Sequence, residues 1–111
     1  MTITEWCKAA YENSKAHGFH DPEAPMNIGE KLALIHSELS EALEEVRSGR
    51  PLGETYYRER DGKPEGLVVE LADACIRIFD LAGSLGLNLE AAIEEKHAFN
   101  KSRPHKHGKV F

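Results

Sequence analysis

The segment from Glu65 to Leu85 constrains the fold more than any other part of the chain. At 100° per residue, its apolar side chains cover about two thirds of the circumference of a helix. They belong to Leu67, Val68, Val69, Leu71, Ala72, Ala74, Cys75, Ile76, Ile78, Phe79, Leu81, Ala82 and Leu85. A helix lying on one small core needs a much narrower stripe, so this helix is expected to be covered on several sides. A chain of 111 residues has few other elements to cover it, which predicts a homo-oligomer.

Three more segments have the spacing of apolar residues that is typical of helices. They run from about Thr2 to His17, from Ile28 to Ser48 and from Asn88 to Lys101, and Gly, Pro and Asn separate them. Strand patterns are weak throughout, and the stretch 49–64, rich in Gly, Pro and charge, is predicted to be a long loop. We therefore expect an all-α fold in which residues 1–111 form a single domain, a four-helix bundle completed by homo-oligomerisation.

The composition excludes several classes of protein. A formal charge of −5 argues against a protein that wraps nucleic acid by neutralising its phosphates. Two cysteines are too few for a disulfide framework, and no apolar run approaches the 18 residues of a membrane span. The first residues lack the basic and apolar regions of an export signal. We expect a cytoplasmic protein with neither a nucleic-acid nor a membrane partner.

Two pairs of acidic residues stand at helical spacing on neighbouring predicted helices. Glu38 and Glu41 are three residues apart, as are Glu70 and Asp73, so each pair shares a face. If the helices pack with these faces together, four carboxylates converge and repel one another unless a cation lies between them. Carboxylates suit Mg²⁺, with Mn²⁺ as a possible substitute.

Solvated helix faces also produce such pairs by chance, so a surface interpretation stays open for both. The pair Glu70 and Asp73 is the more informative, because it occupies the narrow polar sector of the apolar helix predicted for Glu65 to Leu85. Glu44 and Glu45 are interpreted as ordinary surface charges with Arg47 nearby.

The last predicted helix begins with an apolar face that ends in basic and amide groups. Lys96, Asn100 and Arg103 lie on this face. Because burying an unpaired cation is costly, these groups need anionic partners. The partners are either the carboxylates or the phosphates of a bound ligand, since Lys and Arg commonly hold phosphate.

Taken together, these motifs resemble the MazG-like nucleoside triphosphate pyrophosphohydrolases. Glu38-x-x-Glu41 is followed after 28 residues by Glu70-x-x-Asp73, and then by Lys96-x-x-x-Asn100-x-x-Arg103. The resemblance extends from about Asn27 to the end of the chain. The fuller family pattern has two adjacent glutamates before x-x-E, and the first of these positions is Ser37 here.

The resemblance implies an all-α, Mg²⁺-dependent enzyme that hydrolyses an NTP or dNTP to the monophosphate and pyrophosphate and works as a homodimer or homotetramer. It also implies that Glu38, Glu41, Glu70 and Asp73 are metal ligands, with Glu38 and Glu41 catalytic. Lys96, Asn100 and Arg103 would then contact the substrate. The role would be to clear unwanted nucleotides.

Two other functions stay open. One is a non-enzymatic, acidic helical module that dimerises and docks a partner. The other is a di-iron protein, because Glu94-x-x-His97 matches half of a di-iron motif and a dimer would supply a second copy. In the long loop, Tyr56 and Tyr57 are placed either to stack on a base or to pack on the protein itself.

Overall fold

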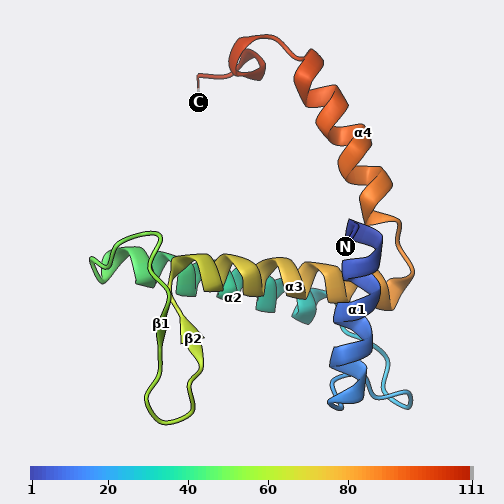
Figure 1. The fold of residues 1–111 in the computed structure, drawn as a ribbon. Helices are drawn as coiled ribbons and strands as arrows, with labels where there is room; N and C mark the ends of the chain where they lie inside the picture. The colour runs from blue at the N-terminus through green and yellow to red at the C-terminus, as the bar shows by residue number, and fades with distance from the viewer. Residues whose placement is uncertain (111) are drawn as a thin grey trace.

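The computed structural model describes residues 1–110 and is predominantly helical (Figure 1). The elements, in chain order, are α1 (Ile3–Ala16), α2 (Ile28–Arg47), β1 (Tyr56–Tyr57), β2 (Pro64–Glu65), α3 (Leu67–Leu85), α4 (Leu89–Ser102) and a 3₁₀ turn, η1 (His105–Gly108). The all-α expectation is confirmed, and each helix begins and ends within two residues of its predicted bounds.

Side-chain caps explain where three of the helices begin. The Thr2 hydroxyl accepts a hydrogen bond from the backbone N–H of Glu5, whose carboxylate accepts one from the N–H of Thr2. At the start of α2 and α4, Asn27 Oδ1 and Asn88 Oδ1 each accept one hydrogen bond, from the backbone N–H of Glu30 and Ala91. Thr and Asn are both residue types that favour the N-cap position.

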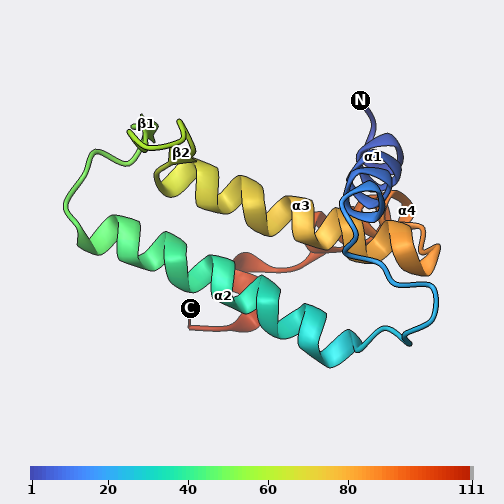
Figure 2. The same cartoon turned by 90° about the horizontal axis from the view of Figure 1, so that it is seen from below.

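The antiparallel pair α2–α3 forms the centre of the molecule, and α1 crosses α3 near the C-terminal end of α3 (Figure 2). Gly83 permits this crossing, because a Cβ there would lie 2.4 Å from the backbone oxygen of Cys7. The buried apolar residues are small: Cys7, Ala42, Ala74 and Ala82. Small side chains allow the helix backbones to approach closely.

Helix α4 leads away from the α2–α3 pair instead of packing on it (Figure 1). Its first turn is fixed to α1 through Glu90, whose carboxylate accepts hydrogen bonds from the Ile3 N–H at 3.1 Å and the Thr4 hydroxyl at 3.2 Å. No residue of α4 is buried. Within one chain α4 therefore does not complete the predicted four-helix bundle, and its packing in an oligomer stays a prediction.

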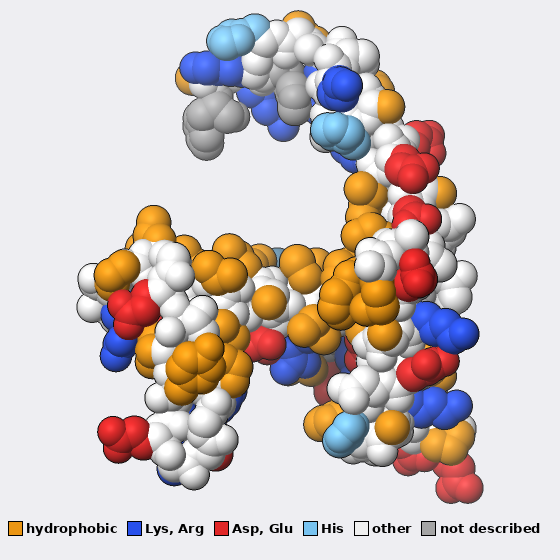
Figure 3. Space-filling view, in the orientation of Figure 1, with side chains coloured by type: hydrophobic (Ala, Val, Ile, Leu, Met, Phe, Trp, Pro, Cys, Tyr) orange, Lys and Arg blue, Asp and Glu red, His pale blue; other side chains and the backbone are white. Residues whose placement is uncertain are grey.

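Large apolar side chains remain exposed on the central helix pair. They include Leu32, Leu39, Leu43 and Val46 on α2 and Val68, Leu71, Ile76 and Ile78 on α3. Figure 3 shows apolar side chains along the edge of the α2–α3 pair that faces α4, and others along the inner side of α4. Within residues 1–110, none of the helices is long and apolar enough to cross a membrane.

The stretch 49–64, predicted to be a long loop, forms most of a short hairpin that extends to Glu65. Strands β1 and β2 pair antiparallel, with Tyr56 opposite Glu65 and Tyr57 opposite Pro64. Strands of two residues are too short to show the alternation by which strands are recognised. The hairpin leads into α3 through Gly66, where a Cβ would lie 2.4 Å from the backbone oxygen of Glu54.

Candidate metal centre

Three of the four predicted metal ligands converge between α2 and α3. Glu38, Glu41 and Glu70 each offer a carboxylate oxygen, and these three atoms lie within 4.8 Å of one another. The Glu38 and Glu70 side chains are buried, with Glu38 7% and Glu70 8% exposed, whereas Glu41 is open to solvent. The helical spacing that suggested these residues thus brings them together in space.

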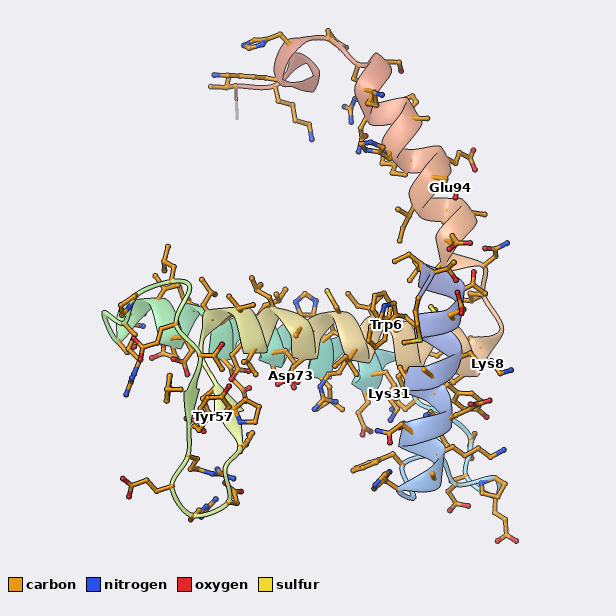
Figure 4. The ribbon with its side chains drawn as sticks, in the orientation of Figure 1. Trp6, Lys8, Lys31, Tyr57, Asp73 and Glu94 are labelled. Carbon is orange, nitrogen blue, oxygen red and sulfur yellow. The ribbon has the colours of Figure 1, made fainter. Side chains whose placement is uncertain are left out.

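Asp73, the fourth predicted ligand, is half-buried one turn further along α3 and is not part of this group of three. Figure 4 places it on the side of the helix pair from which the hairpin projects. Its carboxylate is close enough to Glu38 for the two charges to interact.

Two buried oxygen atoms in the cluster have no hydrogen-bond partner. They are Oε2 of Glu38 and Oε2 of Glu70. Buried polar atoms are nearly always hydrogen-bonded, and an unpaired buried carboxylate oxygen is costly. A divalent cation with oxygen ligands would satisfy both atoms at once, so the donor set fits Mg²⁺ or Mn²⁺.

Burial, together with the neighbouring negative charges, raises the pKa of two carboxylates near the cluster. Burial raises the pKa of Glu70 to about 7, with further contributions from a hydrogen bond to Glu41 and from the charges of Glu41, Asp73 and Glu38. Burial also raises the pKa of Asp73, and the Glu38 charge adds to this, while Lys63 and Arg77 oppose it. Below about pH 7 Glu70 therefore tends to keep its proton, which a bound cation would displace.

Arg77 fixes the orientation of Glu38. Its Nε donates a hydrogen bond to Glu38 Oε1 at 2.6 Å, across the interface between α3 and α2. One Glu38 oxygen is thereby bound and the other, Oε2, is left without a partner. This role was not predicted, although Arg77 lies one turn after Asp73 in the same polar sector of α3.

An open cavity of about 390 Å³ adjoins the cluster on the side of the hairpin. It is lined by Ser40, Glu41, Glu44, Glu45, Lys63, Glu65 and Glu70. The two metal-ligand candidates Glu41 and Glu70 thus form part of a wall that is accessible from solvent.

Tyr56 attaches the hairpin to α2. Its hydroxyl donates to the carboxylate of Glu45, with 2.8 Å to Oε1 and 2.9 Å to Oε2, and the Arg50 guanidinium lies 3.7 Å from the centre of its ring. The hydrogen bond to Glu45 is the main reason that the pKa of Tyr56 rises to about 12. The interpretation of Glu45 as a plain surface charge is wrong, because that carboxylate anchors the hairpin.

The cationic face of α4 does not meet the carboxylates within one chain. Lys96 and Arg103 lie beside the ring of Phe99, with 5.0 Å and 5.5 Å from each charged group to the ring centre. The Asn100 Oδ1 is buried without a hydrogen-bond partner. Because α4 leads away from the α2–α3 pair, these three predicted substrate contacts stand apart from the cluster (Figure 1).

Comparisons of the sequence with protein-family models, with curated proteins and with solved structures give no match. The candidate site therefore depends on its own geometry.

In the part of the chain that the structure describes, the predicted half of a di-iron motif, Glu94-x-x-His97, has no further potential metal ligands grouped with it. Glu94 and His97 lie on the exposed α4 and belong to no group of three potential ligands among residues 1–110. Of the two loop tyrosines, Tyr56 packs on the protein, whereas Tyr57 is 67% exposed.

Proposed function

We propose that this protein is a Mg²⁺-dependent nucleoside triphosphate pyrophosphohydrolase that clears unwanted nucleotides. The observation that carries the proposal is the convergence of Glu38, Glu41 and Glu70, with two buried carboxylate oxygens that lack a hydrogen-bond partner. The motif resemblance adds the substrate class and the site of cleavage, between the α- and β-phosphates.

The residues of the cluster have different proposed roles in cation binding and proton transfer. Glu38 and Glu70 are buried and poised to hold a cation, and Arg77 keeps Glu38 in place. Glu41 can offer one oxygen to the same cation, and because it is exposed at the cavity it is also the carboxylate best placed to accept a proton from an attacking water. A bound Mg²⁺ would offset the charge of the triphosphate and lower the pKa of a coordinated water.

The proposal includes a homodimer or homotetramer, in which another copy covers the exposed apolar faces. The support is the row of large apolar side chains left exposed on α2 and α3, together with the unburied α4. Since α4 does not reach its own cluster, we propose that Lys96, Asn100 and Arg103 contact the substrate bound to a second copy. Charged contacts of this kind stabilise the charge that develops on phosphate oxygens.

A panel of NTPs and dNTPs with Mg²⁺ or Mn²⁺, resolved by chromatography, tests the activity. At least one member should yield the monophosphate and pyrophosphate, and Glu70→Gln should abolish that turnover while circular dichroism shows an intact fold. If no nucleotide is cleaved with either metal, the proposed activity is wrong.

The exposed apolar faces also favour a second candidate, a helical module that only self-associates and docks a partner. That candidate predicts the same oligomer without turnover. It also predicts a melting temperature that does not respond to Mg²⁺ beyond what other salts of equal ionic strength produce.

A further inference from the structure

Lys63 is the one cation that lines the cavity beside the acidic cluster, within the part of the chain that the structure describes. The same cavity is lined by Glu41 and Glu70, so an anion held by a metal there would lie in the space that Lys63 borders. The charge of Lys63 also reaches Asp73, whose pKa it lowers against the effect of burial. Lys63 thus belongs to the surroundings of the cluster although it comes from the hairpin.

The hairpin turn holds the backbone of Lys63 in a defined place. The Lys63 carbonyl accepts from the Arg58 N–H at 2.9 Å, and the Lys63 N–H donates to Asp61 Oδ1 at 3.2 Å. The Arg58 side chain donates to the same Asp61 carboxylate, with 2.9 Å from Nε to Oδ1. Gly62 completes the turn at φ +71°, a backbone conformation that side chains disfavour.

The hairpin is attached to both α2 and α3, the helices that carry the glutamates of the cavity wall. Tyr56 binds Glu45 on α2, and the chain from β2 enters α3 directly through Gly66. The position of the Lys63 backbone relative to Glu41 and Glu70 is therefore set by hydrogen bonds and chain connectivity.

The ammonium group of Lys63 has no ion pair or hydrogen bond of its own among residues 1–110, although several carboxylates line the same cavity. Arg77, which also lowers the pKa of Asp73, is bound to Glu38. Lys63 is thus available to a ligand, whereas Arg77 is engaged in orienting a side chain.

We propose that Lys63 contacts a phosphate oxygen of the metal-bound substrate, as a binding residue supplied by the hairpin of the same chain. The inference rests on the proposed function, because it assumes that a cation and a polyphosphate occupy the cluster. An ammonium is a compact charge that suits a phosphate oxygen, and the contact supplements any made by α4 of another copy.

The test is binding of inorganic pyrophosphate in the presence of Mg²⁺, measured by calorimetry on the full chain. Lys63→Met removes the charge, Lys63→Arg keeps it, and Arg60→Met removes a charge from the same turn at an exposed residue outside the cavity lining. We expect Lys63→Met to weaken pyrophosphate binding about tenfold, as the loss of one charge-assisted hydrogen bond predicts. Lys63→Arg and Arg60→Met should stay within about threefold of the unmodified protein.

Two further readouts separate ligand binding from a structural role of Lys63. If Lys63 only offsets the charge of the cluster, Lys63→Met lowers the melting temperature of the metal-free protein and leaves pyrophosphate binding unchanged. Equal losses in Lys63→Met and Arg60→Met would also overturn the inference, since they indicate a general charge effect.

The same experiment distinguishes the failure of the two proposals. Pyrophosphate binding that requires Lys63, in a protein that cleaves no nucleotide, contradicts the proposed activity and supports the role of Lys63. Nucleotide cleavage with an unchanged KM in Lys63→Met supports the activity and contradicts the role of Lys63.

Discussion

Arg77 Nε lies 2.6 Å from Glu38 Oε1, so a residue of α3 holds a carboxylate of α2 by one of its two oxygens. The other oxygen, Oε2, is buried and has no hydrogen-bond partner. The pair thus orients a ligand toward the space that Glu41 and Glu70 share. Arg77 is a positioning residue in this account, because it acts through Glu38.

Arg77→Met should weaken the binding of Mn²⁺ at least tenfold and destabilise the metal-free protein by about 1–3 kcal/mol, because Glu38 is left buried without its partner. Calorimetry and urea unfolding measure the two effects. The matched control is Arg47→Met, which breaks an exposed pair with Glu44 on α2 and should change stability by less than about 1 kcal/mol. Equal effects in the two variants would show that Arg77 has no special role.

The raised pKa of Glu70 makes the stability of the metal-free protein depend on pH. In the folded state the pKa of Glu70 is about 7, whereas an unperturbed glutamate loses its proton near pH 4.5. Between these values the folded state binds more protons than the unfolded state, so the free energy of unfolding falls as the pH rises. Above about pH 7 this contribution no longer changes.

Glu70→Gln removes that titration, so the variant should lose less stability than the unmodified protein between pH 4.5 and 7. Thermal melts at several pH values in the presence of EDTA measure the difference. Saturating Mg²⁺ should likewise flatten the profile of the unmodified protein, because metal ligands must be deprotonated. Parallel profiles with and without the substitution would contradict the assigned pKa.

Gly83→Ala tests the close approach of α1 to α3. Alanine in a helix interior is normally favoured over glycine by about 1 kcal/mol, but here its Cβ would meet the Cys7 carbonyl oxygen at 2.4 Å. We expect a net destabilisation of about 1–3 kcal/mol in urea unfolding. Gly53→Ala, where no atom lies within 4 Å of the added Cβ, should change stability by less than about 1 kcal/mol.

The proposed supply of α4 residues by a second copy predicts complementation between inactive variants. Glu70→Gln lacks a ligand of the cluster, and Arg103→Met lacks a cation of α4, so each homo-oligomer should be nearly inactive. When the two are unfolded together and refolded, the mixture should regain about a quarter of the activity of the unmodified protein if the unit is a dimer, since half of the dimers are then mixed and each contains one intact site of two. Activity that stays at the level of the separate variants would place α4 and the cluster of the same chain in one site.

The helices could be predicted because local features define them. Thr2, Asn27 and Asn88, which are of residue types that favour N-caps, cap their helices, and Gly86 ends α3 in a left-handed conformation. The hairpin could not be predicted, because its strands have two residues each and its attachment depends on a contact between Tyr56 and Glu45.

The candidate site was predictable in part for similar reasons. Spacing along each helix placed Glu38, Glu41 and Glu70 on faces that could meet, and they do. The contact of Arg77 with Glu38 and the approach of Lys63 to the cavity depend on how separate elements pack, which no local pattern records. The direction of α4 likewise depends on how separate elements pack. The proposed contact of Lys96, Asn100 and Arg103 with a substrate at the cluster therefore stays a prediction.

A Mn²⁺ titration followed by electron paramagnetic resonance decides whether Glu38, Glu41 and Glu70 bind a divalent cation, on which the proposed activity depends. The signal of free Mn²⁺ counts the unbound ions, and Mg²⁺ added afterwards should release the bound ones. We predict saturable binding by the unmodified protein, lost in the double variant Glu38→Gln/Glu70→Gln and retained in Glu30→Gln/Glu94→Gln, which removes two exposed acids elsewhere. Equal binding by both double variants, or none by the unmodified protein, would contradict the account.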